Sequence, residues 1–149
     1  MIKNLNPKDC NFVLSHNYIG YLSYIFQNKP YVVPITYFYK EDSIICYSSL
    51  GHKINAMRKN PNVSLQVSTI DSVTNWESVL VHGIYKEIDG SEAKALLHDF
   101  SLGIKDVIMN LERKDLNYIS EFSAKIYTED SPVVFRIEIE HITGKLRRN

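Results

Sequence analysis

Three stretches rich in aromatic and β-branched residues follow one another with only three or four residues between them. They read "YIGYLSYIF" (18–26), "PYVVPITYFY" (30–39) and "IICYS" (44–48), and they are separated by "QNK" and "KEDS". Such residues favour strands, and short polar connections favour tight turns between antiparallel neighbours. The chain is therefore predicted to begin as a three-stranded meander. The first two strands are apolar on both faces, which predicts a barrel interior on one face and a helix or second subunit on the other.

Further strands are predicted later in the chain. "VSLQVS" (63–68) alternates, with Val63, Leu65 and Val67 on one face, and "TIDSVTN" (69–75) is predicted to be a loop. A long strand follows over 76–88, in which Gly83 predicts a bulge or a close approach by another group. The last predicted strand is "PVVFRIEIE" (132–140).

Helical patterns interrupt these strands at three places. Residues 7–16 are predicted to form a short helix with Asn6 as its cap and Pro7 at its first position, carrying Phe12 and Val13 inward. A second helix is predicted from Gly51 to about residue 59. A third begins at 91–100 with Ser91 as its cap, and irregular helical pieces continue to about residue 125.

This order of elements favours a mainly β fold. About six strands in meander order, with one inserted helix and one helical excursion, fit a small closed antiparallel barrel better than a doubly wound sheet. A chain of 149 residues is the size of one compact domain, so residues 1–149 are predicted to form a single domain.

Composition argues against several classes of partner. Seventeen Lys and Arg balance seventeen Asp and Glu, so no overall field attracts nucleic acid or an anionic membrane, although residues 145–148 are locally basic. No apolar run reaches the roughly 20 residues that span a bilayer, and no signal-peptide pattern opens the chain. The two cysteines and five histidines lack metal-ligand spacing. We therefore expect a cytoplasmic protein that binds no metal, nucleic acid or membrane.

The joint between the third strand and the second helix gathers residues that suit an anion. Ser48 and Ser49 supply hydroxyls, Gly51 permits close approach to the backbone, and His52 and Lys53 add donors and positive charge in the first turn. These features predict a phosphate site. The alternative is that Ser49 caps the helix, Gly51 eases the turn and Lys53 lies in solvent.

Five segments, taken together and in this order, resemble one known family. They are "IGYLSY", "KPYVVPITYFY", "IICYSSLGHKINAMRKNPNVSLQV", "WESVLVHGIYKEI" and "RIEIEHITGK". The chain resembles the pyridoxamine 5'-phosphate oxidase-related FMN-binding split-barrel superfamily, and within it the nitroimidazole-resistance flavoproteins. The resemblance covers nearly the whole chain and is weakest over residues 91–131.

The resemblance implies a six-stranded antiparallel split barrel that forms a homodimer, with FMN, or FAD as the alternative, in grooves between the subunits. The implied contacts to the flavin ring come from Pro34, Ile35 and Thr36. Those to the ribityl chain and phosphate come from Tyr47, Ser48, Ser49, His52 and Lys53. Trp76, Glu77 and Ser78 match the strand edge that closes over the flavin, with Ser78 as its polar contact.

The family resemblance also implies a reaction class. We expect an FMN-dependent oxidoreductase that passes electrons from a reduced nicotinamide to a small acceptor such as a nitroaromatic. Because such chemistry belongs to the cofactor, no catalytic side chain need be visible. Two alternatives stay open: a non-catalytic flavin or haem binder, with His52 or His82 as haem ligand, and a pyridoxamine 5'-phosphate oxidase. The resemblance implies that a true oxidase carries a C-terminal Arg and Trp pattern that helps to bind its substrate. This chain departs from that pattern, because "EIEHITGKLRRN" contains no tryptophan, and the departure argues against the oxidase.

Overall fold

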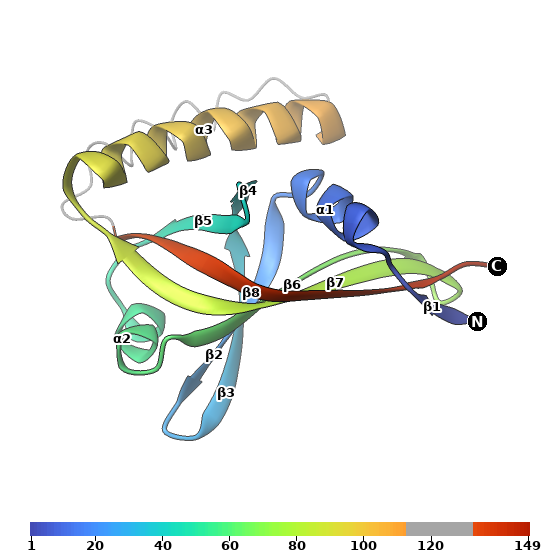
Figure 1. The fold of residues 1–149 in the computed structure, drawn as a ribbon, viewed down its shortest axis with the longest axis horizontal. Helices are drawn as coiled ribbons and strands as arrows, with labels where there is room; N and C mark the ends of the chain where they lie inside the picture. The colour runs from blue at the N-terminus through green and yellow to red at the C-terminus, as the bar shows by residue number, and fades with distance from the viewer. Residues whose placement is uncertain (113–132) are drawn as a thin grey trace.

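The computed structural model describes residues 1–112 and 133–149, which form a mainly antiparallel β structure with three helices (Figure 1). The strands are β1 (Ile2–Asn4), β2 (Ile19–Phe26), β3 (Lys29–Thr36), β4 (Phe38–Lys40), β5 (Ser43–Ser48), β6 (Asn62–Ser72), β7 (Asn75–Ile88) and β8 (Val133–Arg147). The helices are α1 (Pro7–Ser15), α2 (His52–Lys59) and α3 (Gly90–Glu112). The helical pieces predicted between residue 113 and about residue 125 lie outside the described residues.

All strands belong to one sheet, in the order β3-β2-β6-β7-β8-β5-β4, with β1 paired to β8. The mainly β, antiparallel prediction is confirmed. The predicted closure and strand number need correction, because the sheet is not closed and its described part has eight strands rather than six. Strand β5 pairs with β4, as the predicted meander requires, and its other edge pairs with β8.

The break at Tyr37 accounts for one of the additional strands. The predicted strand 30–39 divides there, so that β3 pairs with β2 while β4 pairs with β5. The buried Tyr37 ring is fixed by its hydroxyl, which donates to the Leu14 carbonyl at 2.7 Å, and its amide donates to the Tyr18 carbonyl at 2.9 Å. These contacts take the Tyr37 amide out of the strand pairing.

The two predicted tight turns are present. Gln27 and Asn28 have φ angles of 51° and 62°, and Glu41 and Asp42 have φ angles of 48° and 63°. Two consecutive left-handed residues are the pattern of the two-residue hairpin turn whose twist matches that of the strands. The predicted loop 69–75 is wrong, since β6 runs to Ser72 and β7 begins at Asn75.

Gly83 lies at the predicted bulge. The register between β7 and β8 shifts between His82 and Gly83. A Cβ atom on Gly83 would lie 2.3 Å from the Glu138 carbonyl oxygen and 2.6 Å from Ile137 Cγ2. The close approach of β8 therefore requires glycine here.

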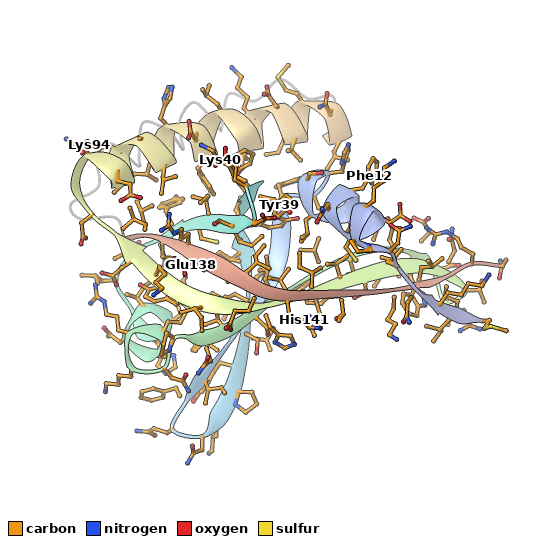
Figure 2. The ribbon with its side chains drawn as sticks, viewed as in Figure 1. Phe12, Tyr39, Lys40, Lys94, Glu138 and His141 are labelled. Carbon is orange, nitrogen blue, oxygen red and sulfur yellow. The ribbon has the colours of Figure 1, made fainter. Side chains whose placement is uncertain are left out.

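Helix α1 begins as predicted. The Asn6 side chain accepts a hydrogen bond from the Asp9 amide at 2.8 Å, and Pro7 occupies the first turn. The predicted inward position of Phe12 is wrong, because Phe12 is 57% exposed (Figure 2). Its ring stacks on that of His16, with 3.7 Å between the ring centroids. A helix this short buries one stripe, and that stripe consists of Cys10, Val13 and Leu14.

Helix α3 covers one side of β5 and β8. Its buried residues recur at helical spacing and are Leu97, Phe100, Ile104 and Ile108. They pack with Ile45 of β5, Ile88 of β7 and Val134 of β8. The predicted cap Ser91 lies inside the helix, because the Ala93 amide already bonds the Asp89 carbonyl at 3.4 Å. The larger core joins the sheet to α1 and α2 and includes buried residues of both helices, such as Leu14 and Met57. No helix in residues 1–112 and 133–149 has the length and apolar character needed to cross a membrane.

Candidate functional site

The N-terminus of α2 lacks a side-chain cap. Gly51 is the capping residue, and no side chain accepts a hydrogen bond from the first-turn amides. The buried Ser48 hydroxyl donates instead to the Ser49 carbonyl at 2.9 Å. The alternative in which Ser49 caps this helix is therefore excluded. Helix α1, by contrast, is capped by Asn6.

Gly51 lies beside open space. Among residues 1–112 and 133–149, no heavy atom lies within 4 Å of a Cβ atom built on Gly51, and its φ of 170° is extended backbone that any residue adopts. Packing therefore does not require glycine at this position. The open space instead leaves room for a small anion to approach the first-turn amides of α2.

Lys53 lies on the half-buried side of α2. Successive residues are rotated by 100°, which places Lys53 between the buried Ala56 and Met57. Burial raises the pKa of the Cys46 thiol on β5, and the positive charge of Lys53 opposes that rise to a lesser degree. Within the described part of the chain, Lys53 has no ion pair or hydrogen bond. A half-buried, unpaired cation thus lies beside an uncapped helix N-terminus.

His52 lies in a different environment. Its Nδ1 atom is 3.0 Å from the Tyr24 hydroxyl oxygen, and its ring centroid is 4.8 Å from that of Phe26 and 4.9 Å from that of Tyr31. We call Tyr24, Phe26, Tyr31 and His52 the aromatic cluster. His52 and Lys53 were expected to act as a basic pair, but the 100° rotation between them directs their side chains to different surroundings.

One face of the sheet, which we call the outer sheet face, carries four other predicted residues: Pro34, Thr36, Trp76 and Ser78. Directly opposed residues in antiparallel strands lie on the same face, and register pairs Tyr21 with both Pro34 and Gln66, Ser78 with Ser68, Trp76 with Ile70, and Thr36 with Ile19. His141 projects from β8 on the side of the sheet away from α1 and α3 (Figure 2). No described helix covers Tyr21 or Pro34, which are both exposed.

The Ser78 hydroxyl oxygen accepts a hydrogen bond from the Gln66 amide nitrogen at 2.8 Å. Gln66 was not predicted as a site residue. The alternation in "VSLQVS" does put Gln66 on the polar side of its strand, but the sequence carries no signal for its register against Tyr21 and Ser78.

Three predicted residues lie neither beside the N-terminus of α2 nor on the outer sheet face. Ile35 is 8% exposed and its side chain is in the core, so only its backbone faces the surroundings of Pro34. Tyr47 faces α3, where its ring lies 5.7 Å from that of Phe100. Glu77 accepts a hydrogen bond from Arg148 at 3.2 Å.

The predicted site residues thus form two groups in one protomer. One group is the α2 joint, with Ser48, Ser49, His52 and Lys53. The other is the outer sheet face, with Pro34, Thr36, Trp76 and Ser78. They lie on opposite faces of β2, because His52 contacts Tyr24 while Pro34 opposes Tyr21. Among the described residues, no three His, Cys, Asp or Glu side chains come close enough to hold a metal ion.

The sequence profile of the pyridoxamine 5'-phosphate oxidase family matches residues 6–146. The chain belongs to this family. An uncharacterised protein of Rhizobium meliloti is 28% identical over 97% of this chain and 94% of its own length. The structure of a FAD-binding protein of Mesorhizobium loti is 30% identical, with a TM-score of 0.75 over 100% of this chain and 98% of that one.

A second similar structure is that of a Bacteroides thetaiotaomicron protein provisionally assigned to 5-nitroimidazole antibiotic resistance. It is 18% identical, with a TM-score of 0.62 over 98% of this chain and 89% of that one. At this identity the likeness concerns the fold alone.

Proposed function

We propose that the protein is a flavin-dependent oxidoreductase that passes electrons from a reduced nicotinamide to a small acceptor such as a nitroaromatic. The observation that carries the proposal is the α2 joint, where unpaired Lys53 accompanies an uncapped helix N-terminus and open space beside Gly51. Membership of the pyridoxamine 5'-phosphate oxidase family and similarity to a FAD-binding protein support a flavin as the anion's source.

The donor set at this joint fits a flavin phosphate. The first-turn amides of α2 and the helix dipole favour a negative group, and the Lys53 ammonium supplies a full charge. The Ser49 side chain is exposed at the same joint and can donate through its hydroxyl. Phosphate oxygens are strong acceptors for all three kinds of donor.

The outer sheet face supports a homodimer in which the second copy covers the flavin ring. Ile19, Tyr21 and Val32 are 50%, 50% and 60% exposed on this face, which is large for apolar side chains of neighbouring strands. They surround Pro34 and Thr36, the residues assigned to the ring. A second copy of the chain would bury this apolar surface and bring an additional set of contacts to each flavin.

The bound flavin would supply the redox chemistry, and the protein would bind and orient it. Ser78 is well placed for a contact to the ring edge, because its oxygen accepts from Gln66 and its own proton is then directed elsewhere. A hydroxyl donor of this kind stabilises negative charge on a reduced ring. This role needs no titratable catalytic residue.

Oxidation of pyridoxamine 5'-phosphate itself is less well supported. The two C-terminal arginines contact the β6–β7 hairpin. Arg147 donates to the Val73 carbonyl at 3.2 Å, and Arg148 donates to the Trp76 carbonyl at 3.2 Å and to Glu77. These contacts occupy the guanidinium groups that the phosphate of pyridoxamine 5'-phosphate would require.

An absorbance spectrum of the purified protein with and without added flavin, followed by anaerobic addition of NADH or NADPH, tests the proposal. Flavin bands that bleach with a nicotinamide and return with a nitroaromatic are the expected result. Bound flavin that no nicotinamide reduces would replace the oxidoreductase proposal with a storage or sensing role. A haem Soret band, or no flavin uptake, would contradict flavin binding altogether.

A further inference from the structure

The outer sheet face carries a groove of about 320 Å³, which we call the polar groove. Its lining includes Ser23, Ser64, His82 and Glu140. The volume lies at the lower end of the roughly 300–1,000 Å³ range of small-molecule sites, which suits one small acceptor. None of the residues assigned to the flavin in the proposed function lines this groove.

Strand register places three polar side chains of this groove in one row across the sheet. Ser23 of β2 lies directly opposite Ser64 of β6, and Ser64 lies opposite His82 of β7. The next row on the same face contains Gln66, whose amide donates to the proposed ring contact Ser78. Two residues of a strand span about 7 Å, so the polar groove begins about that far from the residues assigned to the flavin ring.

A β-bulge adds a carboxylate to the groove. His82 pairs with His141, whereas Gly83 pairs with Ile139. Glu140 therefore has no partner in β7 and is the extra residue of β8. A bulge re-aims side chains, and that of Glu140 lines the same groove as His82. The titratable groups that face His82 are thus Glu140 and His141, since β2 and β6 contribute neutral side chains to this row.

The polar side chains of this groove have no protein partners. Within residues 1–112 and 133–149, no side-chain hydrogen bond or ion pair is formed by Ser23, Ser64, His82 or Glu140. The two serines are half-buried, whereas His82 and Glu140 are exposed. Two hydroxyls, an imidazole and a carboxylate are therefore available to a ligand.

We infer that the polar groove receives the small electron acceptor and that the His82 imidazolium supplies the proton that its reduction requires. The inference rests on the proposed function, in which the flavin ring lies on the same sheet face. The hydroxyls of Ser23 and Ser64 can donate to the oxygens of a nitro group. The Glu140 carboxylate repels an anion, so the groove favours a neutral or cationic acceptor over one that carries a carboxylate.

Reduction of a nitro group needs one proton from the protein. A nitro group that takes up a hydride and a proton gains two electrons and two protons, so that one N–O bond breaks and water leaves a nitroso group. The hydride comes from the reduced cofactor, and the proton comes from His82. Solvent returns the proton to the imidazole between turnovers. A histidine suits this step because its charge changes near neutral pH.

Anaerobic stopped-flow measurement of the two half-reactions tests the inference. NADH or NADPH first reduces the flavin-loaded protein, and the neutral acceptor para-nitrobenzamide then reoxidises it. His82→Gln should leave flavin affinity and the reduction rate as they are in the wild type but slow reoxidation by at least about 100-fold. The wild-type reoxidation rate should fall as the pH rises and the imidazole loses its proton, and His82→Gln should lack this decrease.

His98→Gln is the matched control. His98 is an exposed histidine of α3, and none of the residues on which α3 packs lines the polar groove. This variant should change neither half-reaction.

Glu140→Gln tests the preference for acceptor charge. It should raise the reoxidation rate with para-nitrobenzoate relative to that with para-nitrobenzamide by roughly fivefold, the effect of one charge a few ångströms away in water. An unchanged ratio would place the acceptor outside the polar groove.

Equal reoxidation rates of the wild type and His82→Gln, or equal slowing by His98→Gln, would overturn the inference and leave the proposed function intact. Slowing of both half-reactions by His82→Gln would also overturn it, because a proton donor to the acceptor acts in reoxidation alone. Failure of NADH and NADPH to reduce the bound flavin would overturn the proposed function, and the inference with it.

Discussion

Lys53 lies where an anion is favoured, and no carboxylate of the described residues forms an ion pair with it. Replacing Lys53 with Ala should weaken FMN binding by roughly 1.5–3 kcal/mol through loss of a charged hydrogen bond. Lys53→Arg should retain most of the affinity. Lys8→Ala is the control, because Lys8 occupies the first turn of the side-chain-capped helix α1. Equilibrium titration measures each, and an unchanged affinity in Lys53→Ala would remove Lys53 from the site.

Two glycines separate ligand binding from packing. Gly51→Ala places a methyl group in open space, so it should cost less than about 1 kcal/mol of unfolding free energy but should hinder a phosphate at the α2 amides. Gly83→Ala forces a Cβ atom against the Glu138 carbonyl and should cost about 1–3 kcal/mol. Urea unfolding and flavin titration of both variants distinguish the effects. Normal flavin affinity in Gly51→Ala would argue against close approach of a ligand there.

At the level of elements, local signals predicted much of the structure. The Asn6 cap, the two tight turns and the Gly83 bulge each depend on neighbouring residues, and each is present. The break at Tyr37 depends on Leu14 and Tyr18, which belong to other segments of the chain. Pairing of β5 with β8 likewise joins distant segments. Such contacts leave no periodic pattern in either sequence segment, so the sequence could not predict them.

Helix α2 is joined to β7 by the contact between Arg58 and Glu87. The hydrogen bond from Arg58 lowers the pKa of Glu87 below its ordinary value of 4.5. A lowered pKa in the folded state stabilises the protein above the unfolded-state pKa, and this stability is lost as the pH falls through the folded-state pKa. Glu87→Gln should therefore lower the urea midpoint at neutral pH and leave it nearly unchanged at an acidic pH below the folded-state pKa of Glu87.

The exposed carboxylate of Glu140, which has no ion pair among the described residues, provides the control for this titration. Glu140→Gln should leave the urea midpoint unchanged at both pH values. A midpoint difference in Glu87→Gln that is the same at both pH values would show that the contact stabilises through packing rather than charge.

At the scale of the whole molecule, the candidate site was predicted as one set of residues but lies in two groups. Family position pointed to the residues, whereas their faces depend on helical rotation and strand register. The 100° between His52 and Lys53, and the inward side chain of Ile35, follow from those geometries. The two groups lie on opposite faces of β2. We therefore propose that a second copy of the chain completes the site.

Placing a charge on the outer sheet face should test that dimer. Tyr21→Glu puts a carboxylate among exposed apolar side chains and should shift the protein to a monomer that binds flavin weakly. Met109→Glu is the control, since Met109 on α3 is exposed to the same 50%. Light scattering after size-exclusion chromatography gives the mass. A Tyr21→Glu protein that remains dimeric would place the interface elsewhere.

Sedimentation of the wild-type protein with added flavin, with both protein and flavin absorbance followed, measures whether the chain binds a flavin. We expect flavin absorbance to move with a species of two chains. A protein boundary that carries no flavin absorbance would contradict flavin binding.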